Sequence, residues 1–71
     1  MFRFKVRILG NKAENVLVDE DSTISDVKNI LKDKYPLVVG MRAKFNGIHR
    51  EDYIKMKSLG IRPKDIMLFI G

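Results

Sequence analysis

Residues 66–70, Ile66-Met67-Leu68-Phe69-Ile70, are five consecutive apolar residues next to the last residue of the chain, and they decide its fold. In an extended strand, Met67 and Phe69 point to one side while Ile66, Leu68 and Ile70 point to the other. Such a strand is either buried on both faces or carries an exposed apolar stripe on one of them. The functional interpretation depends on which alternative holds.

The composition predicts one small domain covering residues 1–71. A chain of 71 residues without cysteine has no disulfide or thiolate metal site, so a hydrophobic core must hold the fold together. Fourteen Lys and Arg against nine Asp and Glu give a net charge of +5, which favours anionic partners.

The first seven residues alternate apolar and basic side chains, unlike a signal peptide or membrane span. We therefore expect an intracellular, monomeric protein of the cytoplasm, with the nucleus as an open alternative, and no membrane partner.

The N-terminal region predicts a β-hairpin. Residues 2–8 place Phe2, Phe4, Val6 and Ile8 on one face and basic residues on the other, and residues 9–12 supply turn residues before the apolar run 16–18. Glu14 shares the parity of the two valines in that run, so it is expected at the sheet end or displaced by a bulge.

Residues 19–36 predict one amphipathic helix. Thr23 can cap the free amides, with Asp26 three residues later as its capping-box partner, and Pro36 ends the segment. The apolar side of this helix, of about three turns, is expected to comprise Ile24, Val27, Leu31 and Tyr35, widened by Ile30.

The second half of the chain predicts more strands. Residues 41–45 alternate up to the turn Asn46-Gly47, and residues 48–50 can add a short strand. An irregular stretch follows, with Met56, Leu59 and Ile61 as expected core anchors, before the last strand.

The order of these elements, together with three stretches, resembles the β-grasp fold of the ubiquitin-like family. The stretches are Thr23–Lys28 with Leu31–Lys34, Phe45-Asn46-Gly47, and Leu59-Gly60-Ile61 through Asp65–Ile70. The resemblance implies an α+β fold: a mixed sheet of four to five strands with the helix on one face and the first and last strands parallel at its centre.

Strand parity then assigns the other face of the sheet. It comprises an apolar ridge walled by basic residues, namely Ile66, Leu68 and Ile70 between Arg3, Lys5 and Arg7 on one side and Arg42 and Lys44 on the other.

Ubiquitin-like proteins usually meet partners with this face, and their apolar patch corresponds to Leu9, Lys44, Gly47, Leu68 and Ile70. The central position is aliphatic in ubiquitin, so Lys44 departs from the pattern. A lysine facing an apolar pocket would have to extend outward or find an acid.

Conjugated members of the family, and sulfur carriers of the same fold, end in a flexible tail with two glycines. This chain ends Ile70-Gly71. The resemblance therefore implies neither modifier nor sulfur carrier for the chain as given, with a longer natural chain bearing that tail as the alternative.

No residue pattern indicates an enzyme, a cofactor or a metal. His49 is the one histidine and is expected to be an ordinary surface or turn residue, and no phosphate loop, dinucleotide fingerprint or calcium loop occurs.

Three interpretations remain open. The first is a protein-interaction module for an acidic or amphipathic partner, with Leu9, Arg42, Lys44, Gly47, Leu68 and Ile70 as the partner-binding residues. The second is an RNA or DNA binder that uses Arg3, Lys5 and Arg7 with the rest of the basic face, although the four phenylalanines fall on core parity. The third is that basic side chains merely cover the central strand.

Overall fold

The computed structural model describes residues 2–62 and 64–71, and the side chain of Phe2, expected in the core, lies outside the described part. The strands are β1 (Phe2–Ile8), β2 (Ala13–Val18), β3 (Arg42–Phe45), β4 (Ile48–Arg50) and β5 (Ile66–Ile70). The helices are α1 (Ile24–Leu31), the 3-10 helix η1 (Pro36–Gly40) and α2 (Met56–Leu59).

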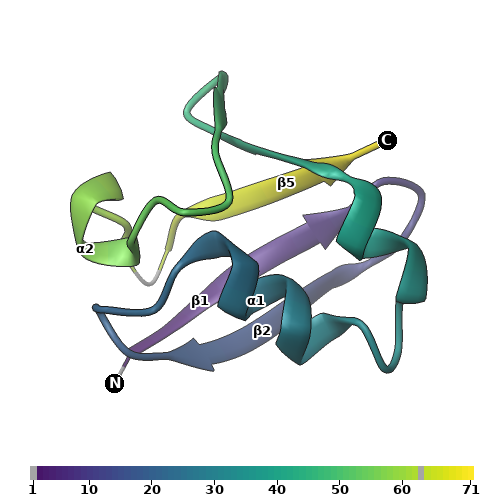
Figure 1. Ribbon diagram of the computed structural model, residues 1–71, viewed down its shortest axis with the longest axis horizontal. Helices are drawn as coiled ribbons and strands as arrows, with labels where there is room; N and C mark the ends of the chain where they lie inside the picture. The colour runs from purple at the N-terminus through teal and green to yellow at the C-terminus, as the bar shows by residue number, and fades with distance from the viewer. Residues whose placement is uncertain (1, 63) are drawn as a thin grey trace.

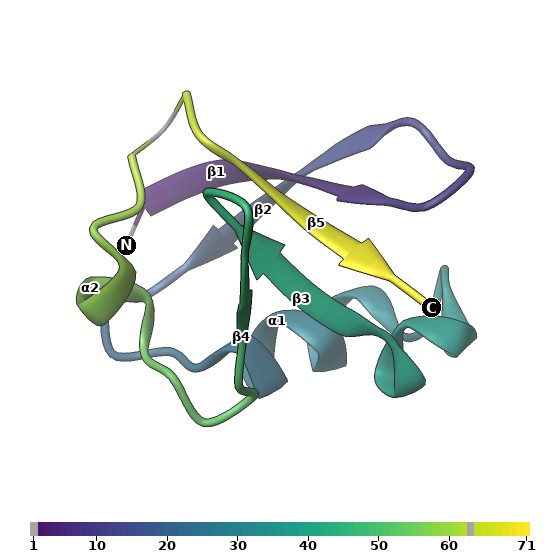
Figure 2. The same cartoon turned by 90° about the horizontal axis from the view of Figure 1, so that it is seen from above.

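The five strands form one mixed sheet in the order β2-β1-β5-β3-β4 (Figures 1 and 2). β1 and β5 are parallel, and the other neighbours are antiparallel. α1 lies across one face of the sheet, in front of β1 and β2 in Figure 1. The fold is therefore α+β with a β-grasp-like topology, as the sequence predicted, and the last strand occupies the middle of the sheet.

The two faces of β5 differ in burial. Met67 and Phe69 are 0% exposed, whereas Ile66 is 41% and Leu68 38% exposed, and Ile70 is half-buried. The helix covers only the inner face, so the second alternative for this strand holds: it carries a partly exposed apolar stripe.

The core lies between the inner face of the sheet and α1. Side chains from the strands and from both halves of the chain fill it, and the largest fully buried ones include Phe4, Phe45, Phe69, Ile24 and Met56. Leu59 and Ile61 pack against this cluster from its edge. The expected anchors of the irregular stretch are thus confirmed.

The start of α1 is confirmed and its end is corrected. The Thr23 amide donates to the Asp26 carboxylate at 2.9 Å, and the Asp26 amide donates to the Thr23 hydroxyl at 3.2 Å, which makes a complete capping box. The helix ends at Leu31, about a turn earlier than expected. Tyr35 precedes Pro36 and adopts φ −131° and ψ 76°, because a residue before proline is disfavoured in the helical region.

The buried side of α1 differs from the expected one at two residues, Ile30 and Lys28. Ile30 is 50% exposed, so its expected place in the apolar stripe is wrong, while Lys28 is only 6% exposed. The Lys28 ammonium group donates to the Met41 carbonyl at 2.6 Å and lies 2.9 Å from the Asp52 carboxylate. A buried cation is stable there because both oxygens compensate its lost hydration.

Glu14 lies near the hairpin end of β2, in a continuous register with β1 that contains no bulge. Its carboxylate accepts hydrogen bonds from the Tyr35 hydroxyl at 2.9 Å and from the Lys34 ammonium group at 3.1 Å. The first of the two expected arrangements is the observed one, and these two donors join the hairpin to the segment after α1.

The turn between β3 and β4 fixes which of their residues face each other. Asn46 has φ 54° and Gly47 φ 77°, and two successive residues with positive φ are typical of the tight type I′ hairpin turn. Phe45 then lies opposite Ile48 and Lys44 opposite His49.

Candidate interaction surface

The outer face is the sheet surface opposite α1. We define it by eight residues of three adjacent strands: Arg3, Lys5 and Arg7 of β1, Ile66, Leu68 and Ile70 of β5, and Arg42 and Lys44 of β3.

The strand register brings these residues side by side in rows across the sheet. Leu68 lies opposite Arg7 on one side and Lys44 on the other. Ile66 lies opposite Lys5, and Ile70 lies opposite Arg42. Each apolar side chain of β5 therefore has at least one basic neighbour in register.

The basic residues of the outer face have no acidic partner within the described part of the chain. The ion pairs there join Lys28 to Asp52, Lys34 to Glu14, Lys57 to Asp21 and Arg62 to Asp65, and none involves an outer-face residue. Like charges flanking an apolar stripe produce a positive potential along its length.

Four of the six expected partner-binding residues are brought together: Arg42, Lys44, Leu68 and Ile70. The other two, Leu9 and Gly47, lie near opposite ends of the apolar stripe. The Leu9 amide donates to the Phe69 carbonyl at 3.0 Å, which places this residue, 65% exposed, near the Ile70 end of the stripe. Gly47 lies beyond the opposite end, because β3 runs antiparallel to β5 and turns after Phe45.

Sequence reasoning missed two neighbours of this surface. His49 is exposed and lies opposite Lys44, so it extends the row of Arg7, Leu68 and Lys44. A two-residue turn at Asn46-Gly47 pairs Lys44 with His49, so the turn signal in the sequence could have identified this neighbour. Leu17 is half exposed and lies opposite Arg3 in the edge strand β2, on the parity not used for the core.

Other kinds of site have less support. Among the described residues, no group of three or more His, Asp and Glu could hold a metal ion. No described helix is both long enough and apolar enough to span a bilayer.

No protein-family model matches the chain, and no curated protein matches it. The observations that bear on its function are therefore its own: a β-grasp-like sheet with an apolar stripe between basic rows.

Proposed function

We propose that this chain is a ubiquitin-like, non-covalent protein-interaction module whose outer face binds an acidic, amphipathic segment of a partner protein. The observation that carries the proposal is the exposure of Ile66 and Leu68 on the central strand of the sheet. Adjacent exposed apolar side chains rimmed by polar residues favour an interaction site.

Burial of the stripe supplies the affinity in this proposal. Completing the burial of a leucine or isoleucine that is about two-fifths exposed contributes about 1 kcal/mol. Ile66 and Leu68, in line with the half-buried Ile70, suit one apolar edge of a helix or strand. The side chains at the centre of an interface dominate its binding energy.

The basic rows select the chemistry of the partner. A second copy of this chain docked face to face would oppose Arg7 and Lys44 with like charges and is disfavoured. An acidic segment instead finds cations on both sides of its apolar edge. Lys44 can lay its aliphatic stem along the apolar stripe while its ammonium group reaches a carboxylate.

Nucleic acid is the second candidate, favoured by the five cations of the outer face, which form no ion pair among residues 2–62 and 64–71. Single-stranded nucleic acid binding usually adds aromatic side chains on which bases stack. Phe4, Phe45 and Phe69 are buried, and the exposed Tyr53 lies outside the outer face, between β4 and α2. The proposal for a protein partner therefore accounts better for the apolar stripe.

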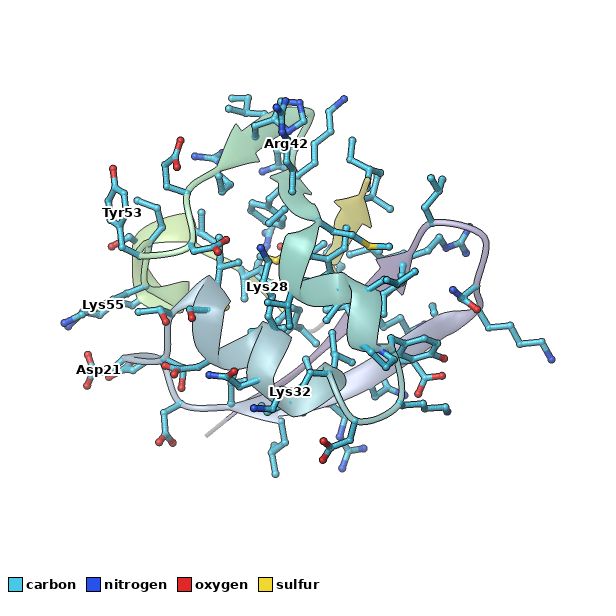
Figure 3. All side chains as sticks on the ribbon, turned by 45° about the vertical axis from the view of Figure 1, so that its right-hand side comes forward. Asp21, Lys28, Lys32, Arg42, Tyr53 and Lys55 are labelled. Atoms are coloured by element: carbon cyan, nitrogen blue, oxygen red, sulfur yellow. The ribbon has the colours of Figure 1, made fainter. Side chains whose placement is uncertain are left out.

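The test is a selection of displayed peptides on the wild-type protein, followed by affinity measurements with the enriched peptides. We expect sequences that combine acidic with apolar residues. Lys44→Glu should weaken their binding about 10-fold or more, because it places a like charge at the centre of the interface. The matched control is Lys32→Glu, which makes the same charge change at an exposed residue directly after α1 (Figure 3).

Two results would contradict the proposal. One is that the enriched peptides bind Lys44→Glu and wild type equally. The other is that a single-stranded oligonucleotide binds more tightly than any peptide, with an affinity that falls steeply with salt and survives loss of the Leu68 and Ile70 side chains.

A further inference from the structure

A second feature lies beside the outer face: a hollow of about 620 Å³ between the end of η1, β3 and the loop after β4. Its lining includes Lys28, Arg42, His49, Arg50, Asp52 and Tyr53. Figure 3 looks onto this side of the molecule, with Arg42 above, Tyr53 at the left and Lys28 between them.

The walls of the hollow are held by the buried ammonium group of Lys28. It bonds the Met41 carbonyl at 2.6 Å on one wall and the Asp52 carboxylate at 2.9 Å on the other. The Ser25 amide also donates to the Asp52 carbonyl at 3.0 Å, which ties the second wall to α1. The hollow is therefore a fixed part of the fold.

Arg50, the last residue of β4, is an unsatisfied cation in this hollow. Its side chain is half-buried, and one terminal nitrogen donates to the Phe45 carbonyl at a long 3.4 Å. Its Nε is buried without a hydrogen-bond partner, and no carboxylate of residues 2–62 and 64–71 forms an ion pair with it. Besides that carbonyl, the guanidinium lies over the Phe45 ring, with 5.9 Å between its carbon atom and the ring centroid.

A partly buried guanidinium without an anion is costly, and a bound anion would remove the cost. The other charges of the lining favour the same ligand. Lys28 and Asp52 neutralise each other, which leaves Arg42 and Arg50, with His49 beside them, against the single carboxylate of Glu51.

We infer that the hollow is a binding site for an oxyanion, a carboxylate or a phosphate, with Arg50 as its main ligand and Arg42 and His49 at its rim. The guanidinium plane presents Nε and one terminal nitrogen side by side, the geometry that binds two oxygens of one anion. Nε is buried in the unbound protein, so binding has to exchange the long 3.4 Å contact with the Phe45 carbonyl for the ligand, which brings this edge of Arg50 to the hollow and gives Nε an acceptor. The inference needs no protein partner, so it stands or falls separately from the proposed function.

The test is a titration of the isolated protein with sodium phosphate and, separately, sodium glutarate, followed by the NMR signal of the Arg50 Nε–H group. Sodium chloride at matched ionic strength is the reference. We expect a saturable downfield shift of this signal, with accompanying shifts at His49 and Arg42. The two anions distinguish the source, since the stronger binder identifies phosphate or carboxylate as the preferred ligand.

Two variants make the titration decisive. Arg50→Leu should lose the saturable response at His49 and Arg42, whereas Arg3→Leu, which removes the same charge from the outer face, should keep it. Arg50→Leu should also melt no lower than wild type in chloride, because an apolar side chain of similar length removes an unsatisfied buried charge. If Arg50→Leu does not fold, Arg50→Lys serves instead, because it lacks the paired nitrogens.

The inference is overturned if the shifts follow ionic strength alike in phosphate, glutarate and chloride. It is also overturned if the Arg50 replacement responds as the wild type does.

Discussion

The two faces of β5 carry the same kind of side chain and meet different surroundings. Met67 and Phe69 are completely buried in the core, whereas Ile66 and Leu68 keep about two-fifths of their surface exposed between rows of arginine and lysine. Hydrophobicity alone does not separate them. The difference shows that one strand can supply the core with one face and, on our proposal, a binding surface with the other.

The comparison is sharpened most by truncating neighbouring residues on opposite faces. Phe69→Ala should lower the free energy of unfolding by about 3–5 kcal/mol, since it leaves a cavity in the core. Leu68→Ala should lower it by about 1 kcal/mol, because much of that side chain is already in water. Urea titrations followed by circular dichroism measure both. Equal losses would mean that the faces do not differ in the way described.

Removing the carboxylate that pairs with the buried Lys28 should have the next largest effect on stability. Asp52→Ala leaves the Lys28 ammonium group with the Met41 carbonyl alone. We expect a loss of about 1–3 kcal/mol, below the full cost for a buried pair because Asp52 is half exposed. Adding Lys28→Met should restore most of that stability, since an apolar side chain of similar length needs no partner. A double variant as unstable as Asp52→Ala would contradict this account.

Acidification tests the contacts that join the hairpin to the rest of the fold. Hydrogen bonds from Tyr35 and Lys34 lower the pKa of Glu14 below its ordinary value of 4.5, and Lys57 lowers the pKa of Asp21 below 3.8 in the same way. A lowered pKa in the folded state stabilises the protein above the unfolded value, and this contribution disappears as the pH falls below it.

The melting temperature should therefore fall between about pH 5 and pH 2, and the fall should be shallower in Glu14→Gln. Glu51→Gln is the matched control, because Glu51 is exposed and forms no ion pair within the described residues. If the melting temperature of Glu14→Gln falls as steeply at acidic pH as that of the wild type, the contacts of Glu14 with Tyr35 and Lys34 do not contribute to stability.

The features that were predictable from sequence are those with a local signal. Alternation located β1, an unbroken apolar run located β5, and the spacing of Thr23 and Asp26 located the start of α1. Parity also placed the outer face of β5 correctly, because a strand offers only two sides.

The features that were missed depend on residues far apart in the sequence. Lys28 falls on the same helical stripe as Ile24, Val27 and Leu31, but a lysine is expected in water. Its burial depends on Met41 and Asp52, 13 and 24 positions away, which the sequence does not reveal. α2 has no side-chain cap; instead, the Met56 and Lys57 amides donate to the carbonyls of Ser22 and Glu20. Its start is therefore set by a loop that is remote in sequence.

The most direct test of the central claim is the calorimetric affinity of Leu68→Ala for a peptide selected on the wild-type protein. The control is Ile30→Ala, which truncates an aliphatic residue that is 50% exposed on α1, on the opposite side of the sheet from the outer face. Our account predicts that Leu68→Ala weakens binding by about 1–3 kcal/mol while Ile30→Ala binds as the wild type does. Unchanged affinity in Leu68→Ala, or an equal loss in both variants, would contradict the claim that the exposed stripe of β5 is the binding surface.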